Sequence, residues 1–276
     1  MSWFKLLTYD MRHGLLRPRY CIIPPLIVIP CLQLFRKLQF AKIRGSCMDY
    51  LLYIFQGMEP VQKTNPADQI HLPILWMVII LCPLLLNLDY MLRDLTNAGQ
   101  QVIIRTQCRK GWFLSKCIWN LTSTALYFLL VVATVWCFVF FCGGDLSFNN
   151  TPVFFPQLFL RANPPITSVP LLHGIAIGLL APFFTISALN LLNMTLCLII
   201  KPILSFFLNT MLLVLAVYCN SAFVLGNGAM TIRSNAVVPG GHRPEISICI
   251  SILAAIVFIA VGSQYFWHAD ILNSEE

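Results

Sequence analysis

Side chains that commonly carry out catalytic or metal chemistry are scattered along this sequence. The five histidines include no pair at i, i+4 and no H-E-x-x-H motif, so they predict no zinc site. The eleven cysteines include no C-x-x-C pair and lie mostly in or beside apolar stretches, which favours small buried side chains over metal ligands. Gly57 and the pair Lys63-Thr64 have the spacing of a phosphate-binding loop, but Gln62 replaces its second glycine and Pro60 interrupts it. We therefore expect no catalytic, cofactor-binding or metal-binding residues in this chain.

Polar side chains within apolar stretches are the remaining candidates. Asp89 and Arg93 are four residues apart, so on a helix they can form an ion pair, with a proton relay as the alternative. Three asparagines could line a translocation path, or could hold helices together within lipid, because amides hydrogen-bond across helices. They are Asn190, Asn193 and Asn209.

The composition places these residues in an integral membrane protein. Hydrophobic residues make up 58% of the 276 positions and charged residues 11%, against about 25% charged residues in soluble domains. The mean hydropathy is +0.77. The formal charge of +7 comes from 18 basic and 11 acidic residues without a basic run longer than two, which excludes a nucleic-acid-binding protein. A disordered chain and a disulfide-stapled secreted domain are excluded by the same composition.

Five apolar stretches are plainly long enough to cross a bilayer, because about 20 helical residues span the hydrocarbon core of roughly 30 Å. A sixth, the first in the chain, meets Arg36 and Lys37 before it reaches full length, and we also count it as a span. We therefore expect an all-α polytopic membrane protein with a single transmembrane domain over residues 1–276. The first stretch contains Pro24, Pro25 and Pro30 and must be kinked or tilted. Only Lys201-Pro202 separates the fourth stretch from the fifth, which predicts a tight hairpin. The predicted spans are 20–38, 72–92, 118–142, 171–200, 203–225 and 246–265.

Basic residues in the loops predict the orientation of these spans. With both termini in the cytoplasm, ten Lys and Arg lie inside and eight outside, a small majority. The loop 93–117 decides the orientation, because it carries five basic residues between two apolar stretches. A re-entrant first stretch would invert the spans that follow it. Residues 1–19 predict an amphipathic helix on the inner leaflet. The outer loop 41–71 contains a short apolar helix, 48–55, that we expect to lie on the outer leaflet or to dip into it.

This order of elements resembles the permease subunits of type-2 ABC exporters. The resemblance covers the architecture of the whole chain, and its residue-level part is a glycine followed by the pattern Arg-x-x-x-Arg-x-x-Trp-x-x-x-Lys in the loop 93–117. The chain departs from the family in its three-proline first span and its large first outer loop. By resemblance, the residues that couple this chain to a partner are Gly99, Arg105, Arg109, Lys110, Trp112 and Lys116.

The resemblance implies a function in the bacterial plasma membrane. It implies that residues 1–19 form an elbow helix, that the loop 93–117 docks on separate ATPase subunits which hold the ATP and Mg²⁺, and that two permeases pair around the substrate path. The few charges in the spans favour a hydrophobic or amphipathic cargo, such as a peptide, a lipid or a drug. The alternative is a membrane sensor or scaffold subunit that transports nothing.

Overall fold

The computed structural model describes residues 3–14, 18–59, 72–88, 90–94, 109–149, 151, 169–237 and 240–268. These residues are helical and contain no β-strand, which confirms the all-α prediction for this part of the chain. Only two isolated bridges, Ser46 with Asp145 and Ser234 with His242, pair extended segments among them.

Four helical runs are long and apolar enough to cross a membrane. The first joins a 3₁₀ turn, η1 (Pro18–Ile22), to α2 (Ile23–Ala41), and the second is α7 (Arg109–Phe141). The third consists of α9 (Leu171–Ile175), a π-helical turn, η3 (Ala176–Leu180), and α10 (Ala181–Ile199). The fourth is α12 (Pro244–His268). The chain is therefore a membrane protein with at least these four candidate spans.

Two further apolar helices are shorter than predicted. α4 (Ile74–Asn87) has 14 residues and α11 (Pro202–Tyr218) has 17. At about 1.5 Å per residue they measure roughly 21 and 25 Å, less than the hydrocarbon core. The chain resumes a helix in α5 (Tyr90–Asp94) directly after α4. The fifth predicted span ends at Tyr218 rather than at 225, because Cys219 adopts an extended conformation and the chain turns away.

The prolines of the first span are largely accommodated by their position. Pro24 and Pro25 occupy the first turn of α2, where a missing N–H removes no helical hydrogen bond, and only Pro30 lies inside the helix. Helix α10 ends at Ile199 and α11 begins at Pro202, which confirms the tight hairpin.

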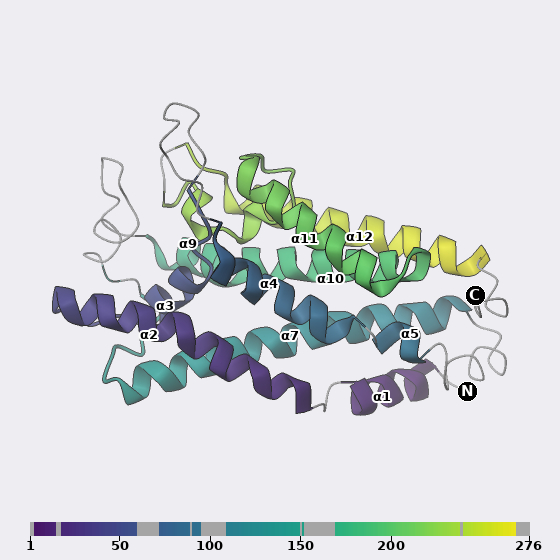
Figure 1. Cartoon of the computed structure of the whole chain (residues 1–276), viewed down its shortest axis with the longest axis horizontal. Coiled ribbons are helices and arrows are strands. Elements are labelled where there is room, and N and C mark those ends of the chain that lie inside the picture. The colour runs from purple at the N-terminus through teal and green to yellow at the C-terminus, as the bar shows by residue number, and fades with distance from the viewer. Residues whose placement is uncertain are drawn as a thin grey trace.

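The helices form one bundle in which α10 is central (Figure 1). It packs against α4, α7, α11 and α12, and it is the most buried of the candidate spans, whereas α12 is the least buried. Helix α1 (Trp3–Gly14), part of the expected helix 1–19, packs against the start of α7, and the N- and C-terminal ends of the chain lie at the same end of the bundle.

Helix α3 (Cys47–Ile54) is the apolar helix expected at 48–55, and its position relative to the outer leaflet stays a prediction. The structure places it within the bundle, in contact with α2, α7 and η3, and leaves only Tyr53 partly exposed. Ser46 caps the helix by accepting a hydrogen bond from the backbone N–H of Asp49, while Asp49 accepts one from that of Ser46. Its apolar residues face all sides, which suits a helix that is packed against several others.

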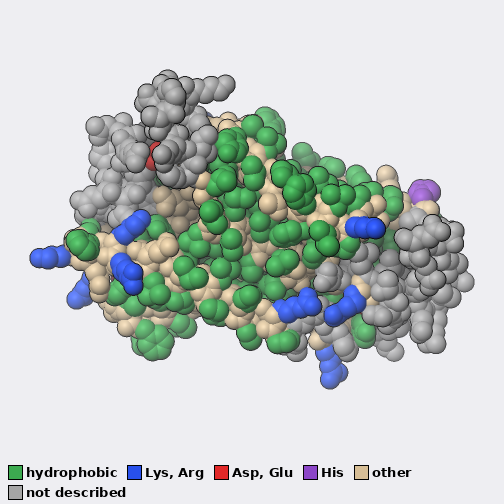
Figure 2. Space-filling view, in the orientation of Figure 1, with side chains coloured by type: hydrophobic (Ala, Val, Ile, Leu, Met, Phe, Trp, Pro, Cys, Tyr) green, Lys and Arg blue, Asp and Glu red, His purple; other side chains and the backbone are tan. Residues whose placement is uncertain are grey.

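The surface of the bundle has the polarity that a membrane requires. Figure 2 shows a broad apolar band between groups of Lys and Arg at the two ends of the molecule. Large apolar side chains of α11 and α12 are exposed on the bundle, for example Phe207 and Leu253. Exposed cations lie at both ends, for example Lys42 at the end of α2 and Lys110 at the start of α7, so the cytoplasmic side stays a prediction.

Candidate functional site

A buried charge cluster joins three elements at the end of the bundle that carries both ends of the chain. The ammonium group of Lys116, on α7, lies 2.5 Å from Oδ1 of Asp10, on α1, and 2.6 Å from Oδ2 of Asp94, on α5. Lys116 and Asp10 are each 1% exposed and Asp94 is 11% exposed. Charges removed from water in this way must be compensated within the protein, so the three elements are held in fixed relative positions.

Neighbouring side chains complete the compensation. Ser115 donates a hydrogen bond of 2.6 Å to Oδ2 of Asp10, and the hydroxyl of Tyr90 donates one of 3.0 Å to Oδ1 of Asp10. The Lys116 ammonium lies 4.8 Å from the ring centroid of Tyr90 and 5.0 Å from that of Trp112, distances at which an aromatic face attracts a cation. We call Asp10, Tyr90, Asp94, Ser115 and Lys116 the charge cluster.

Aromatic contacts extend the charge cluster to α12. Trp112 stacks on Phe266 at 5.0 Å between centroids, and both side chains are buried. At the surface beside them, the Lys110 ammonium lies 4.9 Å from the ring centroid of Trp267, and Arg109 donates a hydrogen bond of 3.3 Å to the carbonyl of Trp267. The ends of α1, α5, α7 and α12 therefore form a single packed unit.

The structure separates the predicted coupling residues into two groups. Lys110 is exposed and Arg109 is partly exposed, so both can contact a partner. Trp112 and Lys116 are buried within the chain, so a partner would act on them through the residues around them. Gly99 and Arg105 lie outside the described residues. The loop expected at 93–117 is also shorter than predicted, because α7 already begins at Arg109. Lys116 can lie inside this helix because two carboxylates neutralise its charge.

The predicted ion pair between Asp89 and Arg93 stays a prediction, because Asp89 lies outside the described residues. The sequence analysis missed Asp10, the principal partner of Lys116. Its position contained a signal, since Asp10 lies three residues after Leu7 and four before Gly14, on the apolar side of an amphipathic helix. An acid there requires a buried partner.

Polar side chains connect the helices farther inside the bundle. Asn190 on α10 donates a hydrogen bond of 2.9 Å to the hydroxyl of Thr124 on α7. Asn193 on α10 accepts bonds from two residues of α11, at 2.7 Å from Ser205 and at 3.2 Å from Asn209. The three asparagines proposed for a path therefore lie between helices: Asn193 and Asn209 bond to each other across α10 and α11, and Asn190 bonds to α7. We call this set, with the residues bonded to it on α7 and α11 and with the separate hydrogen-bonded pair of Asn87 on α4 and Ser123 on α7, the polar seam: Asn87, Asn120, Ser123, Thr124, Asn190, Asn193, Ser205 and Asn209.

The polar seam is incompletely paired. Several buried polar atoms in and beside it have no hydrogen-bond partner among the described protein atoms, and a buried polar atom in that state costs about 1 to 3 kcal/mol. Ser187 lies one turn of α10 from Asn190 and is one of them. Each of these atoms can still accept or donate a further hydrogen bond. The atoms are Asn87 Nδ2, Trp119 Nε1, Asn120 Oδ1, Ser187 Oγ, Asn190 Oδ1 and Asn209 Oδ1.

No group of three or more His, Cys, Asp or Glu among the described residues is arranged to hold a metal ion.

Comparison with known proteins links the chain to one family. No curated protein matches it. The model of a family described as a protein of unknown function, DUF2705, matches residues 26–272, which include most of α2 and every described helix from α3 to α12. Because this match extends over most of its length, the chain belongs to the DUF2705 family.

Proposed function

We propose that this chain is the membrane-spanning permease subunit of an ATP-driven exporter in the bacterial plasma membrane. In this proposal α4 and α11 complete a set of six spans, both termini are cytoplasmic, and a separate ATPase binds the ATP and Mg²⁺. The permease pairs with a second permease, and lipid surrounds the apolar band. The observation that carries the proposal is the charge cluster of Asp10, Asp94 and Lys116.

The charge cluster supports coupling because of where its members lie in the chain. Asp94 ends α5 and Lys116 lies two turns into α7, so the cluster joins the two helices that flank residues 95–108. Asp10 adds the N-terminal helix, and Trp112 adds α12 through Phe266. A force applied by a partner at Arg109 and Lys110 would therefore move four helix ends together rather than bend one loop.

The polar seam supports a path through the bundle. It contains Asn190, Asn193 and Asn209 and lies on α10, the helix that contacts most of the others. Rocking of α10 against α7 and α11 would expose its unpaired polar atoms to a substrate or to water and remove their energetic cost. The weak charge of the seam favours a hydrophobic or amphipathic cargo.

A binding experiment tests the coupling assignment. The cognate ATPase is sought as a neighbouring gene product without membrane spans, and the two proteins are purified together. The double substitution Arg109→Glu with Lys110→Glu is expected to abolish co-purification and the stimulation of ATP hydrolysis. The matched control, Lys42→Glu with Arg44→Glu, changes as many charges at the opposite end of the bundle and is expected to have no effect. Undiminished binding and ATP turnover in the first variant would disprove the assignment.

The second candidate function is a membrane sensor or scaffold without transport. It is favoured by the hydrogen bonds that Asn193 makes to α11, since these also hold a static bundle together. A purified chain that binds no ATPase, together with unchanged substrate export after deletion of its gene, would support this function over the permease.

A further inference from the structure

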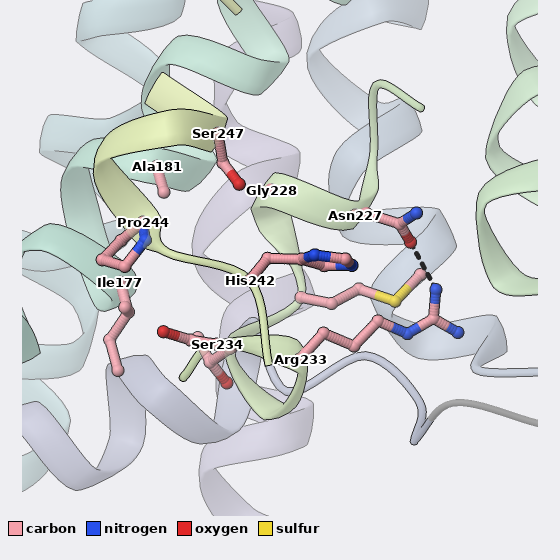
Figure 3. A pocket seen from close by; sticks show the side chains of 11 residues that line it. Ile177, Ala181, Asn227, Gly228, Arg233, Ser234, His242, Pro244 and Ser247 are labelled. Carbon is pink, nitrogen blue, oxygen red and sulfur yellow. Dashed lines mark hydrogen bonds between the residues drawn. The ribbon is translucent and has the colours of Figure 1, made fainter. Parts of the chain in front are cut away.

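The connection between α11 and α12 forms a compact structure at the end of the bundle opposite the charge cluster. It contains two short 3₁₀ turns, η4 (Asn227–Ala229) and η5 (Thr231–Arg233), and most of its residues from 226 to 234 are buried. Beside these turns is a small pocket that also includes residues of η3, α10 and α12 (Figure 3).

Arg233 holds this connection to the end of α11. Its side chain is 1% exposed, and its Nη1 and Nη2 donate hydrogen bonds of 2.5 and 2.6 Å to the carbonyls of Ala216 and Val217. These carbonyls are in the last turn of α11, where they have no helical partner and where the helix dipole is negative. A guanidinium group therefore satisfies the acceptors and stabilises the helix end electrostatically.

The same side chain reaches two other segments. Nε of Arg233 donates a hydrogen bond of 2.9 Å to the carbonyl of Met58, which follows α3, and Nη1 also bonds to Oδ1 of Asn227 (Figure 3). Asn227 in turn donates bonds of 2.6 and 2.7 Å to the carbonyls of Cys219 and Ser221. Arg233 is thus the residue at which α11, the chain after α3 and η4 converge.

Backbone hydrogen bonds hold η5 to the end of α3. The N–H groups of Thr231 and Ile232 donate to the carbonyls of Phe55 and Gln56 at 2.9 and 3.2 Å, and the hydroxyl of Thr231 donates to Leu52 at 3.0 Å. Residues 231–233 therefore satisfy the free carbonyls of α3 and of α11 at the same time.

Two glycines permit this close approach. Gly57 has φ +71 and Gly226 has φ +113, conformations that favour glycine. A Cβ atom at Gly57 would also lie 2.4 Å from Cγ of Met230, and one at Gly226 would lie 2.9 Å from Cβ of Ala216. Glycine at positions 57 and 226 therefore allows residues 226–234 to pack closely against the chain after α3 and against α11.

The turns cover the ends of three helices. The indole N–H of Trp76 on α4 donates a hydrogen bond of 3.1 Å to the carbonyl of Ala229. Gly228 lies against Thr185 of α10 and Ser247 of α12, so closely that a Cβ there would be 2.9 Å from Oγ1 of Thr185. Behind Gly228, the hydroxyls of Thr185 and Ser251 are 3.3 Å apart, between α10 and α12.

We propose that residues 226–234 form a plug that closes this end of the bundle, and that Arg233 holds the plug in place by its bonds to α11 and to the chain after α3. The plug adds a gate to the proposed permease. It rests on the proposed function only for the identity of the cargo that would pass when the plug opens. The plug leaves its position when α11 moves away from α3, because Arg233 and Thr231 cannot then bond to both helices.

The test measures access to Thr185 behind the plug. In the full-length protein in nanodiscs, Thr185→Cys is labelled with a water-soluble thiol reagent, and the label is read in the peptide that contains position 185. Arg233→Met is expected to raise the labelling rate at least about tenfold, since charge-assisted hydrogen bonds are lost. The control Arg243→Gln removes an exposed cation of the same connection and is expected to leave the rate unchanged. The native exposed Cys219 serves as the reference for reagent access.

A milder variant guards against unfolding. Cys117 is buried near the opposite end of α7, so its labelling reports loss of the whole fold. If Arg233→Met exposes Cys117, Thr231→Val decides, because it removes only the hydroxyl bonded to Leu52 and is expected to raise labelling at position 185 severalfold. Unchanged labelling at position 185 in the folded variant overturns the plug. If labelling at position 185 is faster in the variant but the chain binds no ATPase, the plug is supported and only the proposed permease function is contradicted.

Discussion

The ammonium group of Lys116 and the carboxylate of Asp10 are separated by 106 residues in sequence and by 2.5 Å in the structure. This contact connects the N-terminal helix to the helix that begins at the surface residues Arg109 and Lys110. It makes the N-terminal helix part of the helical bundle rather than a separate anchor. Motion of one of the two helices must therefore move the other, or break a buried ion pair.

Breaking this pair from one side is expected to be costly. Lys116→Met leaves the carboxylates of Asp10 and Asp94 buried without their cation, and we expect a loss of about 3 to 5 kcal/mol in the free energy of unfolding. Adding Asp10→Asn is expected to recover part of the loss, because one of the uncompensated charges is removed. Thermal unfolding in detergent measures both variants. Lys110→Met, at an exposed position, is the control and should change stability by less than about 0.5 kcal/mol. A Lys116→Met protein as stable as the wild type would contradict the charge cluster.

Packing of α1 on α7 is expected to depend on Gly14. A Cβ atom there would lie 2.0 Å from Nε1 of Trp119, a buried ring that also lies against Tyr90. Gly14→Ala should therefore displace α1 at a cost of about 1 to 3 kcal/mol and speed limited proteolysis after it. Gly174→Ala provides the matched control, since its nearest neighbour would be 3.5 Å away at the flexible end of Met48. Equal proteolysis of the two variants would show that α1 is not held in this way.

The helices were predictable to the extent that apolar length determines them. Composition and apolar length predicted the all-α membrane fold and the hairpin at Lys201, but they placed the end of α11 at 225 because residues 219–225 are also largely apolar. Cys219 is extended, and Arg233 binds the last carbonyls of α11, a contact between segments that hydropathy does not report. The burial of α3 likewise depends on the helices around it.

The candidate site was predictable only at its surface. Arg109 and Lys110 were identified by their charge and are accessible, whereas Lys116 was expected in a loop and is buried in a helix. A lysine shows no sign in sequence of whether it faces water or an acid from a distant segment. The burial of Lys116 depends on its ion pair with Asp10, and the only sign of this pair in the sequence was the position of Asp10 on the apolar face of a helix.

Asn190 distinguishes a path from simple packing. Asn190→Leu removes its bond to Thr124 and also its unpaired Oδ1, so the two effects on stability nearly cancel and we expect a change below about 1 kcal/mol. If Asn190 lines the path, this substitution should nevertheless lower transport of the cargo in reconstituted vesicles. If Asn190 only packs helices together, transport should not change. A double-mutant cycle of Asn193→Leu and Asn209→Leu measures how much their contact stabilises the bundle, with a coupling energy of roughly 0.6 to 1.7 kcal/mol expected. Unaltered transport with Asn190→Leu would assign the seam to packing alone.

Acidification is expected to loosen the plug through His242. Its Nε2 lies 2.9 Å from Oδ1 of Asn220, and burial, followed by the nearby charge of Arg233, lowers the pKa of the imidazole below its usual 6.5. The unfolded connection therefore binds a proton more readily than the closed plug, so the contribution of His242 is fully present above pH 6.5 and is lost as the pH falls below it. Asp49 on α3 acts in the opposite direction, because burial raises the pKa of its carboxyl group and its ionised form is the disfavoured one. Loosening of the plug at acidic pH can thus be assigned to the imidazole of His242.

Hydrogen exchange of the Thr231 and Ile232 amides, corrected for the intrinsic rate at each pH, should accelerate between pH 7.5 and about 5.5 in the wild type and not in His242→Gln. The same acceleration in both proteins would remove His242 as its cause.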